Sequence, residues 1–199
     1  MTSVFDIRTV FAGGAFLAAM IGTHPAQAND DAAWKKLAEG GKVVLMRHAA
    51  VNAGRGQGNS LLRDPSCKQE RNLSSDGERA AAEVGKQFRE RNIPVSEVRH
   101  SPFCRTADTA RIAFGQGVPA AYLSLLEILG PDEAAAQTRA LSDVIGGYTG
   151  AGNLVLITHE PNINAVSFEM MKPSDFLVLR PLGGSEFEEL GVVRWRGPE

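Results

Sequence analysis

The sequence contains only two cysteines, Cys67 and Cys104, and four histidines among its 199 residues. None of these residues form the closely spaced pairs that zinc ligands usually show, so no zinc site is expected. Neither charge is in excess, since 21 Lys and Arg face 23 Asp and Glu, and no basic stretch is interleaved with aromatic residues. This balance argues against a protein that binds nucleic acid or an anionic membrane surface.

The one marked apolar run lies near the N-terminus, over residues 10–22, and is too short to span a bilayer comfortably. It is followed by Ala26-Gln27-Ala28, which has the small-x-small pattern of a cleavage site. We therefore predict a signal peptide over residues 1–28, with an uncleaved anchor as the alternative. The mature chain, residues 29–199, would be periplasmic or secreted, would contain no membrane span and would be long enough for one domain.

Export changes the interpretation of the cysteines. In an oxidising compartment, an even number of cysteines in an exported chain indicates pairing. We predict a disulfide between Cys67 and Cys104, with two buried free thiols as the alternative. Cys67 lies in a long segment, residues 50–75, that is rich in Gly, Asn, Ser and Arg and lacks periodicity. Because loops of this length are usually functional or tied down, the disulfide would fasten the segment.

Strand and helix patterns alternate along residues 29–199. Apolar runs predict buried strands over 43–46 and 153–158, and further strands are predicted over 95–100, 176–180 and 186–195. Helical spacing and capping signals predict helices over 30–41, 78–92, 103–114, 132–145 and 161–171, whereas 120–128 fits a strand or a loop. The alternation predicts an α/β fold, a three-layer sandwich with a mostly parallel central sheet and helices on both faces.

Ionisable residues follow three of the predicted strands. Arg47 and His48 end the first strand, Arg105 begins the helix after the second, and His159 follows the strand over 153–158. Carboxyl ends of parallel strands meet at one edge of a sheet, so these side chains should converge. The planar guanidinium group of arginine can donate two parallel hydrogen bonds to phosphoryl oxygens, and a helix N-terminus favours an anion. A histidine that is not a metal ligand can act as a nucleophile. The pattern predicts a phosphate pocket; taken alone, residues 47–48 also fit an ordinary strand end.

Four short motifs cover nearly the whole mature chain. The segments are LMRHA at 45–49, LSSDGERAA at 73–81, SPFCRTADTA at 101–110 and VLITH at 155–159. In this order they resemble the strand-R-H-G, L-T/S-x-x-G-x-x-x-A, S-P-x-x-R-x-x-x-T-A and late strand-G-H motifs of the histidine phosphatase superfamily. Ala49 and Thr158 stand where that family has glycine. Both are small, and we expect them to narrow the pocket.

The resemblance implies a phosphoglycerate mutase-like fold and a phosphatase that needs no metal or cofactor. His48 would attack phosphorus and form a phosphohistidine that water hydrolyses. Arg47, Arg105 and His159 would hold the phosphoryl oxygens. The pattern therefore implies an enzyme, with a non-catalytic phosphate- or phosphosugar-binding module of the same fold as the alternative.

Other residues have candidate roles in the same pocket. A leaving alkoxide needs a proton, and two carboxylates compete to supply it: Glu160, slightly favoured because it directly follows His159, and Glu127, which otherwise faces water. Asn52, Ser101 and Asn162 are candidates to hydrogen-bond the phosphate or to orient the core, or alternatively are turn and cap residues.

The expected substrate is a small-molecule or glycolipid phosphate ester. The signal peptide, the small size and the stretches RNLSSDG at 71–77 and SPFCRT at 101–106 resemble small exported phosphatases proposed to act on lipopolysaccharide core heptose phosphates. A mutase is less expected, because glycolytic phosphate esters are not expected outside the cytoplasm.

Overall fold

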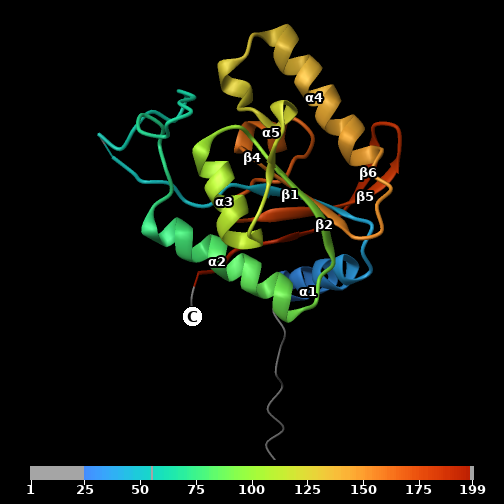
Figure 1. Cartoon of the computed structure of the whole chain (residues 1–199). Coiled ribbons are helices and arrows are strands. Elements are labelled where there is room, and N and C mark those ends of the chain that lie inside the picture. Colours follow the sequence, from blue (N-terminus) through green and yellow to red (C-terminus); the bar gives the residue numbers. More distant parts are fainter. Residues whose placement is uncertain (1–24, 55, 198–199) are drawn as a thin grey trace, which may run out of the picture.

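The computed structural model describes residues 25–54 and 56–197 (Figure 1), so the predicted signal peptide lies outside the described residues except for its last four positions. The strands are β1 (Val43–Arg47), β2 (Val95–His100), β3 (Val118–Pro119), β4 (Asn153–Thr158), β5 (Phe176–Gly183) and β6 (Glu186–Val193). The helices are α1 (Pro25–Ala38), α2 (Ser75–Glu90), α3 (Cys104–Phe114), α4 (Pro131–Gly146) and α5 (Glu160–Asn164), with short 3₁₀ turns η1 (Ala121–Leu123) and η2 (Leu126–Ile128).

The strands form one mixed sheet in the order β3-β2-β4-β1-β5-β6. The first four strands in this order are parallel, whereas β5 is antiparallel to β1 and β6 is antiparallel to β5. A tight connection after Gly183, with positive φ at Gly183 and Gly184, allows β5 and β6 to pair as a hairpin. The predicted α/β class and mostly parallel sheet are confirmed.

Helices cover both faces of the sheet, as Figure 1 shows. On one face, α1, α2 and α3 pack on alternate residues of β1 and β4, including Val44 and Met46. On the other face, α4 and α5 pack on the intervening residues, including Val43 and Leu45. Because both faces are covered, β1 and β4 are apolar nearly throughout, which is the pattern that made them recognisable in the sequence.

Three elements differ from the sequence predictions. Helix α1 begins at Pro25 rather than residue 30, so it includes the predicted cleavage motif. Residues 120–128 form the two 3₁₀ turns, and the two-residue strand β3 precedes them. Helix α5 ends at Asn164 rather than at Met171. The Met171 side chain is buried and its carbonyl oxygen accepts a hydrogen bond from Arg47, so a tertiary contact replaces the predicted helical turns.

Helix α2 is held tightly against the chain that leaves β1. Ser74 caps the helix through a hydrogen bond from the Gly77 amide, and the Ser74 amide donates to the Ala50 carbonyl. A Cβ atom at Gly77 would lie 1.9 Å from the Ala50 oxygen, so any larger residue would push the helix away. The glycine of the L-S-x-x-G stretch therefore fixes the segment that immediately follows His48.

Candidate active site

Two histidines and two arginines predicted to converge lie together at the carboxyl ends of β1 and β4. The His48 amide donates to the Thr158 carbonyl at 3.0 Å, which aligns the two strand ends. The His48 and His159 ring centroids are 5.4 Å apart, and Arg105 Nη2 lies 3.1 Å from His159 Nδ1. These residues line a pocket of about 210 Å³ whose other lining residues are Arg47, Val51, Ser60, Arg71, Leu125, Glu127, Glu160 and Pro161.

The His48 ring is oriented by its own backbone. Its Nδ1 lies 2.8 Å from the carbonyl oxygen of Ala49, so Nδ1 carries the proton and donates, and Nε2 keeps its lone pair. Burial lowers the pKa of His48 to about 3, and the nearby charges of Arg105 and Arg47 act in the same direction. At neutral pH the ring is uncharged and its Nε2 is available as a nucleophile.

His159 is held in a defined tautomer as well. An arginine can only donate, so the contact with Arg105 makes His159 Nδ1 an acceptor and leaves the proton on Nε2. That Nε2 lies 2.8 Å from Ser101 Oγ, to which it donates. Burial, reinforced by the charge of Arg105, lowers the pKa of His159 well below its usual value. Ser101 is fully buried behind His159 and orients it.

The two guanidinium groups have buried donors without partners. Arg47 Nη1 donates to the Met171 carbonyl at 2.5 Å and lies 2.8 Å from a Glu160 carboxylate oxygen. Arg105 Nη2 also donates to the Ser60 carbonyl at 3.1 Å. Among the described residues, Arg47 Nε and Arg105 Nη1 are buried with no hydrogen-bond partner. Since buried donors are almost always satisfied, these atoms indicate an anionic ligand.

Burial lowers the pKa of Arg105 to about 10, which still leaves the guanidinium charged at neutral pH. The guanidinium carbon of Arg105 lies 4.4 Å from the centroid of the Phe103 ring, so the side chain makes a cation–π contact with this ring. The buried charge of Arg105 is therefore fixed in place before any ligand arrives.

The two candidate proton donors both line the pocket, but their surroundings differ. Glu160 is paired with Arg47. The carboxylate of Glu127 has no hydrogen bond or ion pair within the described part of the chain. Asn162 accepts from the Leu126 amide and donates to the Ser124 carbonyl, so it supports the turn that carries Glu127.

Three small or polar residues lie behind the pocket rather than in its wall. Asn52 donates to the Leu73 carbonyl, which places it as a turn residue. The Thr158 hydroxyl donates to the Leu123 carbonyl, and Ala49 is fully buried against Thr109. Ala49 and Thr158 are not among the lining residues, so they tie neighbouring segments together instead of narrowing the pocket as expected.

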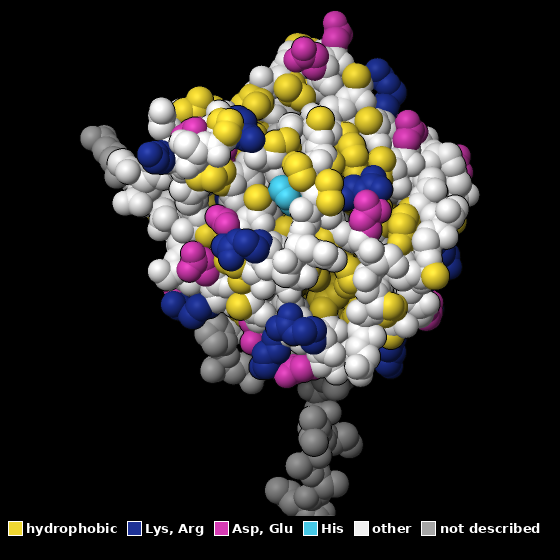
Figure 2. All heavy atoms as spheres, in the orientation of Figure 1, with side chains coloured by type: hydrophobic (Ala, Val, Ile, Leu, Met, Phe, Trp, Pro, Cys, Tyr) yellow, Lys and Arg dark blue, Asp and Glu magenta, His cyan; other side chains and the backbone are white. Residues whose placement is uncertain are grey.

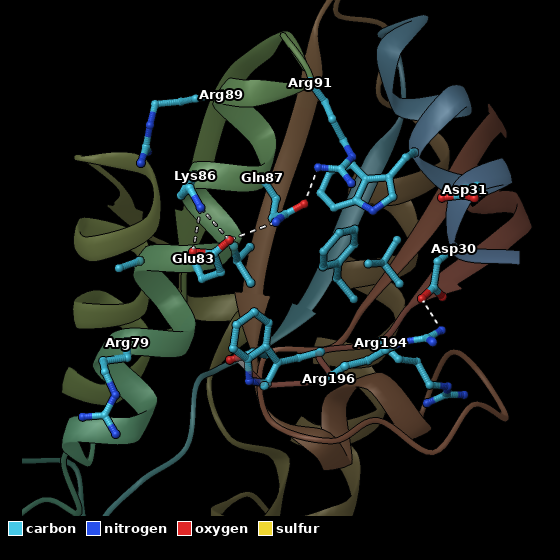
Figure 3. A pocket seen from close by; sticks show the side chains of 18 residues that line it. Asp30, Asp31, Arg79, Glu83, Lys86, Gln87, Arg89, Arg91, Arg194 and Arg196 are labelled. Atoms are coloured by element: carbon cyan, nitrogen blue, oxygen red, sulfur yellow. Dashed lines mark hydrogen bonds and ion pairs between the residues drawn. The ribbon is translucent and has the colours of Figure 1, made fainter. Parts of the chain in front are cut away.

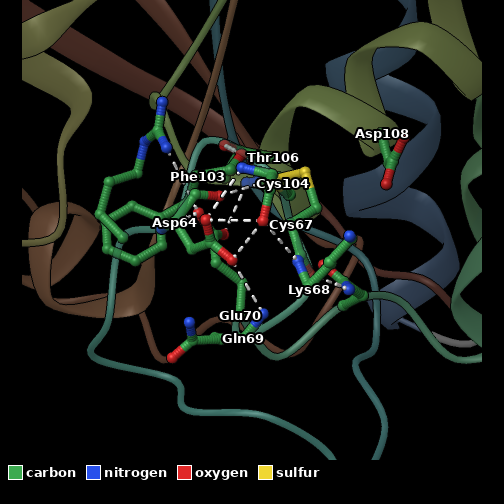
Figure 4. The surroundings of a disulfide bond; sticks show 12 residues. Asp64, Cys67, Lys68, Gln69, Glu70, Phe103, Cys104, Thr106 and Asp108 are labelled. Atoms are coloured by element: carbon green, nitrogen blue, oxygen red, sulfur yellow. Dashed lines mark hydrogen bonds and ion pairs between the residues drawn. A yellow bond between two sulfur atoms is a disulfide. The ribbon is translucent and has the colours of Figure 1, made fainter.

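The loop between β1 and α2 adds three residues to the pocket that were not predicted as site residues, Val51, Ser60 and Arg71. The predicted disulfide between Cys67 and Cys104 is present, with Cα atoms 5.8 Å apart, and fastens this loop to the first residue of α3 (Figure 4). The only sequence signal for Arg71 is its place as the first residue of the stretch RNLSSDG at 71–77. Its position in space depends on the disulfide and on long-range contacts.

Exposed apolar side chains neighbour some of the residues that line the pocket. Figure 2 shows a histidine side chain at the surface among hydrophobic side chains, with charged groups mostly farther out. Leu61 and Leu62, next to Ser60, and Ile128, next to Glu127, are among the exposed large hydrophobic residues.

A larger hollow of about 920 Å³ lies between α1, α2 and the segment after β6 (Figure 3). Six arginine and lysine side chains line it against three carboxylates, and some of these are paired, as Asp30 is with Arg196 and Glu83 with Lys86. It shares no lining residue with the histidine pocket. The histidine pocket is therefore the candidate active site.

Neither a metal-binding cluster nor a spanning helix is found in residues 25–54 and 56–197. No group of three or more His, Cys, Asp or Glu side chains there could hold a metal ion. No helix in this part of the chain is long and apolar enough to cross a membrane.

The buried neutral histidines predict that acid destabilises the fold. Below the usual histidine pKa of about 6.5, the unfolded chain binds protons that the folded chain excludes, so stability falls as pH drops from 6.5 toward 3. We expect the free energy of unfolding to decrease by up to about 1.4 kcal/mol per pH unit for each buried ring. Urea denaturation at pH 7 and pH 4.5 measures this decrease. The free energy of unfolding of His48→Asn should fall less between pH 7 and pH 4.5 than that of wild type. An equal fall in the two proteins would contradict a neutral His48.

Comparison with known proteins agrees with this site. A model of branch 1 of the histidine phosphatase superfamily matches residues 43–127, a range that contains His48, Arg105 and Glu127. A search of curated proteins finds no match.

Solved structures share the fold at low sequence identity. The protein histidine phosphatase SixA with bound tungstate is 14% identical, with a TM-score of 0.57 over 77% of this chain and 96% of that chain. A mycobacterial glucosyl-3-phosphoglycerate phosphatase is 15% identical, with a TM-score of 0.54 over 74% and 96%. A phosphoserine phosphatase from Entamoeba histolytica is 12% identical, with a TM-score of 0.54 over 78% and 98%. The motifs in their order, the family model over residues 43–127 and the shared fold all make the chain similar to the histidine phosphatase superfamily.

Proposed function

We propose that this phosphatase is an exported phosphomonoesterase that hydrolyses its substrate through a phosphohistidine on His48. The observation that carries the proposal is the state of the His48 ring. It is neutral, its proton is held on Nδ1 by the Ala49 carbonyl, and its free Nε2 belongs to a pocket lined by arginines. A neutral imidazole beside guanidinium groups is suited to attack on a bound phosphoryl dianion.

In the first step, the phosphoryl oxygens accept hydrogen bonds from the unpartnered donors of Arg47 and Arg105. The lone pair on His48 Nε2 forms a bond to phosphorus while the bond from phosphorus to the ester oxygen breaks. The arginine charges neutralise the oxygens in the transition state and also stabilise the phosphorylated ring. His159, held by Ser101 and Arg105, closes the pocket beside the reacting group.

The departing ester oxygen takes a proton from a carboxylic acid, and we assign this role to Glu127. Glu160 is engaged with Arg47, whereas Glu127 reaches the pocket without a described partner. In the second step, the Glu127 carboxylate accepts a proton from water as the water oxygen attacks phosphorus. The bond between phosphorus and Nε2 breaks, inorganic phosphate leaves, and both His48 and Glu127 return to their starting states.

Trapping the intermediate tests this function directly. The purified protein is mixed with a phosphorus-labelled aryl phosphate and quenched, and label retained on the protein is measured. We expect acid-labile, base-stable label on wild type and none on His48→Ala. If wild type binds phosphate but retains no label and releases no phenol between acid and neutral pH, the chain is a phosphate-binding module instead.

Export is the second part of the proposal, supported by the apolar run before Ala28 and by the disulfide. Disulfides persist mainly in oxidising compartments. Cleavage after Ala28 would spare the residues of α1 that pack in the core, the first of which is Ala33. We expect intact-mass analysis of protein made with its full leader to show a chain that starts at Asn29, and with both cysteines oxidised. A full-length chain with free thiols would contradict export.

The substrate class is the least constrained part. The pocket is small, and the apolar residues near its mouth, such as Leu61 and Ile128, are exposed. This arrangement supports a phosphate ester whose alcohol extends out of the pocket, such as a sugar phosphate on a glycolipid. The neighbours named as phosphatases of protein histidine, phosphoserine and glucosyl-3-phosphoglycerate differ in their leaving groups, so the fold itself does not specify the leaving group.

A further inference from the structure

Arg71 is a third arginine in the wall of the histidine pocket. Its Nε is buried and has no hydrogen-bond partner among the described residues. Its Nη2 lies 3.5 Å from the Gly58 carbonyl, at the outer limit of a hydrogen bond. Arg71 is also near enough to Arg105 for the two like charges to oppose each other, as its lowering of the Arg105 pKa indicates. The buried carboxylate of Glu70 offsets this repulsion at Arg105, and a bound anion would offset it further.

The charge balance of the pocket points to the same ligand. Three guanidinium groups line it against two carboxylates, and one of these, Glu160, is already paired with Arg47. Both histidines are neutral, because burial lowers their pKa values. A bound phosphoryl dianion would bring negative charge to the buried free donors of Arg47, Arg71 and Arg105 together.

Arg71 is placed by covalent and polar contacts at the start of α3. The disulfide joins Cys67 to Cys104, which directly precedes Arg105 (Figure 4). The neighbour of Arg71, Glu70, is buried, and its two carboxylate oxygens accept from the amides of Asp64 and Cys104. The loop carrying Arg71 is thus fastened to the helix that carries Arg105, so the two arginines keep a fixed relation.

We propose that Arg71 is a further phosphoryl-binding residue and that the Cys67–Cys104 disulfide positions it. This deepens the proposed function, on which it rests for the nature of the ligand. It follows that the oxidised protein binds a phosphoryl group or its analogue more tightly than the protein without the disulfide. Because Arg71 is held by a bond that only an oxidising compartment preserves, full affinity would appear only after export.

Binding of tungstate and of inorganic phosphate, measured by calorimetry, tests the proposal without any need for turnover. Four variants are compared with wild type: Arg71→Gln, the pair Cys67→Ser with Cys104→Ser, the combination of all three changes, and Lys68→Gln. Lys68 is the control because it carries the same charge on the same loop and is exposed. The KM and kcat for an aryl phosphate are measured in parallel.

We expect Arg71→Gln to raise the dissociation constant about tenfold or more, as the loss of a charge-assisted hydrogen bond does. The cysteine pair should raise it by a similar factor. In the combination of all three changes, the two factors should not multiply. Loss of the disulfide can have no further effect through position 71 once the arginine there has been replaced. Lys68→Gln should bind as wild type does. The KM should follow the dissociation constant, with a smaller change in kcat.

Two results would overturn the proposal. Unchanged binding by Arg71→Gln removes the arginine from the site, and multiplied factors in the combination show that the disulfide does not act through Arg71. If the cysteine pair fails to fold, reduction of folded wild type replaces it, with the tertiary circular dichroism signal recorded before and after. If Arg71→Gln weakens tungstate binding while wild type shows no turnover, the inference stands and the proposed function fails. If wild type forms the phosphoenzyme but Arg71→Gln binds tungstate as wild type does, the proposed function stands and the inference fails.

Discussion

Replacing His48 with asparagine is expected to abolish phosphatase activity while leaving the pocket intact. The asparagine amide takes the place of Nδ1 and can still donate to the Ala49 carbonyl, but nothing replaces the nucleophilic Nε2. Removal of a covalent nucleophile costs several orders of magnitude, so we expect kcat to fall by about 10³-fold or more. Steady-state hydrolysis of an aryl phosphate measures the loss, and tungstate binding should survive.

The control for this variant is His100→Asn. His100 is as buried as His48, each being 8% exposed, and its Nδ1 makes an equivalent contact with the carbonyl of the next residue, Ser101. It does not line the pocket. His100→Asn should therefore keep at least about half of the activity. If the two variants lose activity equally, the loss reflects damage to the strand ends, and the nucleophile lies elsewhere.

The part of the site that the sequence predicts is the part that follows rigid strands. Arg47 ends β1, His48 follows it and His159 follows β4, so the parallel pairing of these two strands places the three residues together. Apolar runs such as Val43–Met46 identify such strands without ambiguity, since both faces are buried. The local sequence pattern and the general topology of parallel sheets are sufficient to predict this part of the site. The ionisable residues at the carboxyl ends of the strands indicate where the pocket lies.

The part that the sequence does not predict depends on contacts between distant segments. Arg71 and Ser60 reach the pocket because Glu70 and Cys67 bind the start of α3, far away along the chain. A loop without periodicity gives no information on which of its residues face inward. The correct pairing of Cys67 with Cys104 placed the loop near the site, but the orientation of individual side chains needed the structure.

The same limit applies to polar residues whose chemical type fits two roles. The sequence makes Ser101 and Asn162 candidates either to bind phosphate or to orient the core. In the structure, Ser101 accepts from His159 and Asn162 holds the turn before Glu127. Their hydroxyl and amide groups are equally suited to a phosphate or to a protein partner, so only the positions of neighbouring groups decide between the roles.

The second large effect is expected for Glu127→Gln, and it should depend on the leaving group. An alkoxide needs a proton as it departs, whereas p-nitrophenolate is a stable anion near neutral pH and departs without one. Because general acid catalysis contributes about 10²–10⁴-fold, we expect kcat/KM for an alkyl phosphate to fall by about that factor. The value for p-nitrophenyl phosphate should change less than tenfold. Comparing both substrates in one variant isolates proton donation from binding.

Glu160→Gln is the matched comparison, since Glu160 lines the same pocket and carries the same charge. Its carboxylate holds Arg47, and its side chain is 35% exposed, so loss of the pair should loosen phosphoryl binding modestly. That loss raises KM for both substrates alike and gives no dependence on the leaving group. The opposite pattern, with the dependence appearing in Glu160→Gln and absent from Glu127→Gln, would identify Glu160 as the proton donor. Arg47 would then exchange its carboxylate partner for the substrate as the phosphoryl group binds.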